Sequence, residues 1–274
     1  MKKYFITALV FLATTAAFAQ KKRSKNNPPP PSKDTTVVSK TLLAPAPAPA
    51  PVGGKPKKDW SKINLTKRSA DHFMFQLGYD NWAGAPDSIH IQGFNRSANF
   101  YVMFDFPFKT DPRLSIGAGL GIGSSNIFFH QQTVLVAAVG AGSLGFPSEE
   151  GGEHWKKYKL VTTYLEAPVE LRFALDPEHM DNSWKFALGV KVGLMLSAYT
   201  KAKDRQNAAN QTIGSYIEKE SSKQFFNTPR LAGTARISKG VIGVFGQISA
   251  TSLIKSSAGP SVFPFSMGIT LSGL

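Results

Sequence analysis

The stretch YLEAPVELRF, residues 164–173, alternates apolar and polar residues as a β-strand does. Its polar positions hold two carboxylates, a proline and a guanidinium: Glu166, Pro168, Glu170 and Arg172. A strand packed inside an apolar core accommodates neither a proline nor unpaired charges. The two faces of this strand must therefore meet very different surroundings.

Seven other segments alternate with the same period of two. They are residues 72–80, 98–106, 114–123, 184–197, 230–237, 241–249 and 262–271. Their lengths centre on about ten residues, the number that a tilted strand needs to cross the hydrocarbon of a bilayer. Strands of soluble sandwiches are usually shorter. We predict an all-β fold, an eight-stranded antiparallel up-and-down transmembrane β-barrel whose apolar faces meet lipid.

The connections between these strands alternate in length. The longer ones are residues 85–94, 126–157, 198–225 and 255–261, and the shorter ones are 107–112, 176–183 and 238–240. Outer-membrane barrels combine short periplasmic turns with longer outer loops, so both chain ends are expected in the periplasm. Within the longest loop, the apolar segment TVLVAAVGAGSLGF (133–146) either extends the hairpin or folds over the barrel mouth as a lid or partner surface.

The polar face of residues 164–173 should point into the barrel lumen, which is narrow enough for side chains to fill it. Glu166 and Glu170 are expected to pair there with cations at lumen-facing positions. The candidates are Arg172, Lys185, Lys191, Arg230 and Arg236, and Asp105 joins the same predicted charge network. Pro168 lacks a backbone donor, which indicates a local bulge or bend. The predicted role of this network is structural.

The segment LSIGAGLGIG, residues 114–123, has glycine at every second position. A phosphate-binding glycine loop needs a turn that leads into a helix. Glycine at alternate positions is instead one face of a strand. The segment therefore predicts no nucleotide cofactor.

The N-terminal quarter of the chain differs from the rest. Residues 1–19 have the features of a secretory signal peptide, with Lys2 and Lys3 before an apolar run and Ala-Phe-Ala at 17–19. Residues 20–68 carry twelve Lys and Arg against two Asp and are rich in proline, which predicts a disordered periplasmic tail. The barrel is assigned to 69–274. With no cysteine, the chain has no disulfide framework or thiol metal site.

Catalysis is the weaker interpretation of the polar loop residues. The longest loop contains His130, His154, Glu149, Glu150 and Glu153, but their spacing fixes no catalytic dyad. Two further histidines, His90 and His179, fall in other connections. We therefore expect no enzyme activity, no metal and no cofactor. Nucleic acid is not an expected partner either, because the folded part concentrates no positive charge with stacking aromatics.

The first stretch also carries a family resemblance. Its residues Tyr164, Leu165, Glu166 and Pro168 are similar to the Tyr-Leu-Glu-Ile-Pro strand of the PorT-like outer-membrane β-barrel proteins of Bacteroidetes-type bacteria. The segment ALGVKVGLMLSAYTK (187–201) resembles the next strand of that family and its exit into a loop. The resemblance implies an eight-stranded outer-membrane barrel and, through the family's named member, a link to type IX protein export.

These observations lead to one expected function and two alternatives. We expect a non-enzymatic scaffold or accessory in envelope assembly or secretion, located in the outer membrane with its tail in the periplasm. Its expected partners are outer-membrane lipid and envelope or secretion proteins. The alternatives are a tether that binds peptidoglycan or another anionic partner through the tail, and a small passive channel.

Overall fold

The computed structural model describes residues 72–137, 140 and 142–273. The predicted signal peptide (1–19) and basic tail (20–68) lie outside these residues. No helix in the described part is long and apolar enough to cross a membrane.

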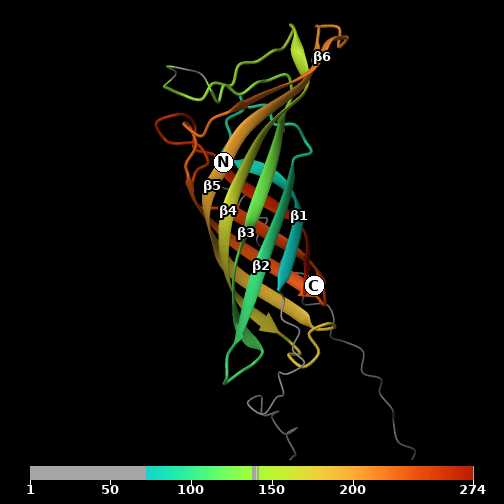
Figure 1. The fold of residues 1–274 in the computed structure, drawn as a ribbon, viewed down its shortest axis with the longest axis vertical. Coiled ribbons are helices and arrows are strands. Elements are labelled where there is room, and N and C mark those ends of the chain that lie inside the picture. Colours follow the sequence, from blue (N-terminus) through green and yellow to red (C-terminus); the bar gives the residue numbers. More distant parts are fainter. Residues whose placement is uncertain (1–71, 138–139, 141, 274) are drawn as a thin grey trace, which may run out of the picture. The chain divides into compact units, whose positions relative to one another are not determined.

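The described residues contain nine strands. They are β1 (Phe73–Ala83), β2 (Arg96–Pro107), β3 (Leu114–Phe129), β4 (His154–Ala174), β5 (Trp184–Gln206), β6 (Thr212–Ser221), β7 (Pro229–Lys239), β8 (Ile242–Ser249) and β9 (Phe263–Ser272). Eight of them close a ring of antiparallel pairs in the order β1, β2, β3, β4, β5, β7, β8, β9 and back to β1 (Figure 1). The predicted eight-stranded antiparallel barrel is confirmed.

The remaining strand, β6, pairs only with β5 and lies outside the closed ring. The pattern predicted a long connection over residues 198–225, which was wrong because β6 lies within it. β4 and β5 have 21 and 23 residues, and their ends continue past the barrel as a three-stranded extension with β6 (Figure 1). Ile213, Tyr216 and Ile217 give β6 the β-branched and aromatic residues that favour strands.

A bulge in β5 changes which residues point inward. Thr163 pairs with Ser197 but Tyr164 pairs with Met195, so Leu196 has no partner on β4. Before the bulge the odd-numbered side chains of β5 are buried, and after it the even-numbered ones are. Of the bulge or bend predicted at Pro168, the bulge was wrong, because Pro168 pairs with Lys191 without a shift in register.

The two faces of the barrel wall differ as the alternation predicts. Along β5, Val190 and Val192 are 48% and 54% exposed, whereas the intervening Lys191 is 1% exposed. Apolar side chains of all eight barrel strands form a continuous exposed surface, here called the apolar belt, and the charged side chains are inside. This inverted distribution is typical of a barrel with lipid outside and a polar interior.

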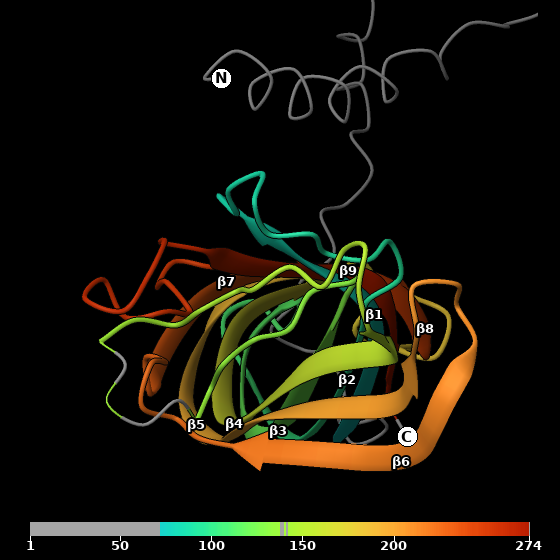
Figure 2. The same ribbon diagram turned by 90° about the horizontal axis from the view of Figure 1, so that it is seen from above.

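The longer connections gather at one end of the barrel (Figure 2). Buried apolar side chains from these connections and from the strand ends form a cluster there, here called the apolar cap. Val134 and Val136 of the longest loop are fully buried, and the backbone of Leu144 donates to the carbonyl of Ala258 in the β8–β9 connection at 2.7 Å. The cap also contains inward side chains of the strand ends, including Trp82, Phe129 and Tyr158, and Phe226 of the β6–β7 connection. The described parts of the predicted lid segment, residues 133–137 and 142–146, therefore fold over the mouth.

The described chain ends lie at the opposite end of the barrel from this cap. Met74 at the start of β1 pairs with Ser272 at the end of β9. The short connections 108–113, 175–183 and 240–241 lie at the same end. The alternation of long and short connections is therefore confirmed, while the side of the membrane that each end faces stays a prediction.

Candidate functional site in the barrel lumen

Glu166 of β4 is the centre of the upper part of the lumen. One of its carboxylate oxygens, Oε2, accepts a hydrogen bond of 2.5 Å from the Tyr101 hydroxyl of β2. The other, Oε1, forms an ion pair of 3.1 Å with Nη1 of Arg230 on β7. The side chain of Glu166 is 3% exposed, so its charge is balanced by protein groups rather than by water. These groups come from opposite walls of the barrel, β2 and β7. Charge-assisted hydrogen bonds of this kind are the strong ones.

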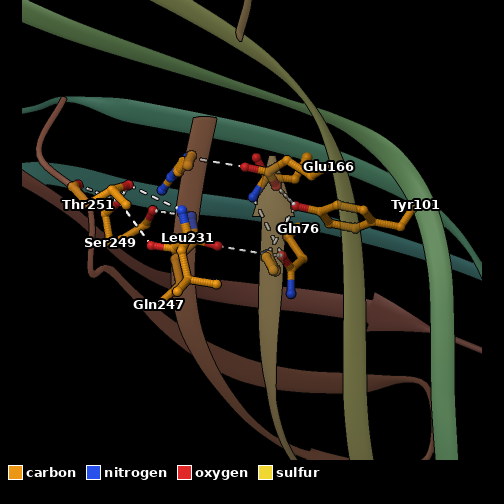
Figure 3. A network of polar contacts seen from close by, with 11 residues as sticks. Gln76, Tyr101, Glu166, Leu231, Gln247, Ser249 and Thr251 are labelled. Atoms are coloured by element: carbon orange, nitrogen blue, oxygen red, sulfur yellow. Dashed lines mark hydrogen bonds and ion pairs between the residues drawn. The ribbon is translucent and has the colours of Figure 1, made fainter. Parts of the chain in front are cut away.

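Lys191 of β5 lies beside this group and is held by oxygen atoms. Its Nζ donates to Oε1 of Gln76 at 3.1 Å, to the Tyr101 hydroxyl at 3.0 Å and to Oε1 of Gln247 at 2.7 Å. Figure 3 shows Gln76, Tyr101 and Glu166 converging at this point, with Gln247 nearby. Tyr101 accepts from Lys191 and donates to Glu166, so it links the buried ammonium to the buried carboxylate.

Glu170 is the centre of the lower part. Its Oε2 accepts from Nε of Arg172 at 3.1 Å and from Nη2 of Arg236 at 2.9 Å. Arg172 also reaches Oδ1 of Asp105 at 3.6 Å, and Arg236 donates to Oγ of Ser272 at 2.9 Å. The side chain of Glu170 is 1% exposed, so these two guanidinium groups replace the water that a carboxylate needs.

The structure thus brings together the eight residues of the predicted charge network in two groups. Lys185 lines the same small pocket as Asp105, Arg172 and Arg236. The sequence analysis did not include Gln76 or Gln247, although both lie on polar strand faces. The alternation of polar and apolar residues places Gln76 and Gln247 inside the barrel. Their contact with Lys191 depends on how the closed barrel brings strands that do not pair to the same height.

The glycine face of β3 has a packing role in this lumen. A Cβ built on Gly117 would collide with the guanidinium of Arg172, and one on Gly121 with the backbone carbonyl of Phe100 and the ring of Tyr101. The absent side chains leave the space that the large lumen residues of β2 and β4 occupy. This is the physical reason for glycine at alternate positions.

The polar loop residues considered for catalysis form hydrogen bonds and ion pairs within and between the loops. His154 is buried, with its ring nitrogens 3.1 Å from the Gly152 carbonyl and from Oδ1 of Asn210. Glu149 forms an ion pair of 2.8 Å with Arg205, which also reaches Glu153 at 3.6 Å. Exposed Glu150 lies 3.6 Å from His90, and His130 is exposed. These contacts do not assemble a nucleophile with a base.

Three potential metal ligands meet in the β4–β5 turn. Ligand atoms of Asp176, Glu178 and His179 lie within 4.8 Å of one another, and all three residues are exposed. Nδ1 of His179 is 3.2 Å from Oδ2 of Asp176. Exposed groups of this kind are common without a metal, and the turn is at the opposite end of the barrel from the cap.

The match to a family model agrees with the architecture. A family model described as outer membrane protein beta-barrel domain matches residues 69–235. No curated protein matches the sequence. Among solved structures, the chain is similar to Ail, the attachment invasion locus protein of Yersinia pestis, solved in complex with the heparin analogue sucrose octasulfate. The identity is 10% over 73% of this chain and 97% of that chain, with a TM-score of 0.30.

Proposed function

Because this chain belongs to the outer membrane protein beta-barrel domain family, we propose that it is a non-enzymatic scaffold of the outer membrane that assists envelope assembly or protein secretion. The observation that carries the proposal is the filled interior. Lys191, Tyr101 and Glu166 bridge the lumen, and the apolar cap covers one mouth. A barrel filled in this way offers its outer surfaces, its loops and its N-terminal segment to partners.

The closer assignment to PorT-like proteins and the type IX system is part of the same proposal. It is supported by the motif of Tyr164, Leu165, Glu166 and Pro168. Tyr164 and Glu166 are buried on the inner face of β4. A passive channel is disfavoured, because eight strands leave an interior that side chains can fill.

A tether is the second candidate function. The observation that favours it is the excess of twelve Lys and Arg over two Asp in residues 20–68. Such a charge attracts anionic polymers, and proline keeps the segment extended.

The test compares proteins released into the medium by a deletion strain and its parent, with envelope integrity measured in parallel. The scaffold proposal predicts loss of a defined set of secreted proteins, restored by the full chain. A normal set of secreted proteins with a leaky or blebbing envelope would contradict the role in secretion and favour the tether. Complementation with a chain that lacks residues 21–58 separates the contribution of the N-terminal tail from that of the barrel. It should still insert into the membrane, while any partner binding that depends on the tail is lost.

A further inference from the structure

The outer face of the three-stranded extension carries lysines opposite one another on neighbouring strands. Lys201 of β5 pairs with Lys159 of β4 on one side and with Lys219 of β6 on the other. One rung further out, Lys157 pairs with Lys203. Like charges directly opposite each other destabilise a sheet. Five lysines in two adjacent rungs therefore form a face whose mutual repulsion an anionic partner would relieve.

The protein itself provides little negative charge here. Among the described residues, one carboxylate forms an ion pair with these five lysines: Oδ2 of Asp204 lies 3.9 Å from Nζ of Lys203. Lys159 donates instead to the neutral amide oxygen of Asn126 at 2.7 Å, and Lys219 lies 4.2 Å from the ring centroid of Tyr199.

The acidic residues of β6 are on the opposite face of the extension. Glu218 and Glu220 alternate with Lys219 along the strand and line a pocket of about 380 Å³ together with Tyr158 of the cap. The extension is therefore acidic toward the cap and basic on the outside. Outside, the cations remain available to a ligand.

An aromatic groove adjoins the lysines. Phe94, Arg96, Phe128 and Lys157 are among the residues that line an open pocket of about 450 Å³. The guanidinium of Arg96 lies 5.1 Å from the ring centroid of Phe94, which is 68% exposed, and 5.7 Å from that of Phe128. Aromatic residues form girdles at the two edges of the lipid-facing surface of such barrels. The groove therefore resembles part of a membrane interface.

The position of the lysines relative to the apolar belt indicates the kind of anion. Lys159 lies on β4, the strand that also carries Val169 and Leu171 of the belt, and it is six residues from Leu165. At about 3.3 Å per residue this is about 20 Å along β4, and less in height because barrel strands are tilted. Lys159 therefore lies beyond the belt residues of β4 on the cap side, where a headgroup layer would adjoin the belt.

We propose that this basic face, formed by Arg96, Lys157, Lys159, Lys201, Lys203 and Lys219, binds the phosphate groups of a phosphorylated lipid headgroup. The acyl chains would lie along the apolar belt on the same strands. Lysine ammonium groups bind phosphate as compact point charges, and the planar guanidinium of Arg96 can donate two parallel hydrogen bonds. This binding does not require the secretion role proposed above, because it uses only the outer wall of the barrel.

The test uses the full chain in neutral detergent micelles and measures by native mass spectrometry how much diphosphorylated lipid A stays bound. Replacing Lys159 and Lys201 together by glutamine should weaken retention by about tenfold or more. The matched control replaces Lys109 and Lys239 by glutamine, since both are exposed at the other end of the barrel. The control should retain the lipid as the unchanged chain does. Equal retention by the two double variants would overturn the proposal.

Two further arms identify the ligand's chemistry with the unchanged chain, so they do not depend on whether a variant folds. Lipid A stripped of its phosphates should be retained about tenfold less than the diphosphorylated form. Equal retention of both forms would overturn a role for phosphate. A phosphorylated glucosamine disaccharide without acyl chains should compete weakly. Competition as strong as that of the whole lipid would overturn the assignment to a membrane lipid.

Discussion

Replacing Glu170 by alanine should lower the free energy of unfolding of the barrel by about 3–5 kcal/mol. The change removes the carboxylate between Arg172 and Arg236 and leaves two buried guanidinium groups without their shared partner. Asp105 stays 3.6 Å from Arg172, but one carboxylate then faces two buried guanidinium groups, and the excess buried charge costs more than the lost hydrogen bonds themselves contribute. Unfolding by urea and by heat in detergent, followed by the shift in gel migration between folded and unfolded barrel, measures the loss.

The control for this change is Asp87→Ala, which removes an exposed carboxylate from the β1–β2 connection. It should change the free energy of unfolding by no more than about 0.5 kcal/mol. A double-mutant cycle with Arg236→Ala tests the pairing itself. Because Glu170 and Arg236 are in direct contact, the combined loss should be smaller than the sum of the single losses. Additive losses, or an unchanged stability of Glu170→Ala, would contradict the proposed pairing.

Replacing Val190 by arginine should destabilise the membrane-inserted barrel by about 2–4 kcal/mol. Val190 is 48% exposed on the belt and is flanked on the same face by Leu188 and Val192. In water, an arginine at such an exposed position would be harmless. In hydrocarbon it loses its hydration without gaining a partner. The measurement is folding into phospholipid vesicles at a series of urea concentrations.

Ile213→Arg provides the matched comparison. Ile213 is 52% exposed, about as much as Val190, but it lies on β6, outside the closed ring of strands. Its replacement should leave vesicle folding unchanged within about 0.5 kcal/mol. Equal losses for the two variants would mean that exposure alone explains the effect, and equal tolerance would mean that Val190 does not contact lipid.

The barrel could be predicted from sequence because its signal is local. Along β5, Trp184 to Leu194 alternate with small and charged residues, and this period directly reports the two surroundings of a wall strand. The extension was missed because Lys157, Lys201 and Lys203 are as polar as a solvated loop. The bulge at Leu196 has no comparable signal, since an extra residue in one strand depends on the partner strand's register.

The members of the lumen network could be predicted, but most of their pairings could not. Alternation places Glu166 and Arg230 inside the barrel, yet these residues are 64 positions apart and on strands that are not neighbours. Their contact depends on how strand tilt and stagger bring opposite walls to the same height. The ion pair of Glu170 with Arg172 could be predicted from the sequence, because the two residues are two positions apart on one face of the same strand.

The proposed scaffold role depends on a lumen that is filled by side chains. Conductance across planar lipid bilayers that contain the purified full chain tests this claim most directly. Because Tyr101, Glu166 and Lys191 bridge the lumen and the apolar cap covers its mouth, we expect no current steps above those of the bare bilayer. Reproducible steps of defined size, proportional to voltage, would show an open path through the lumen and contradict the account.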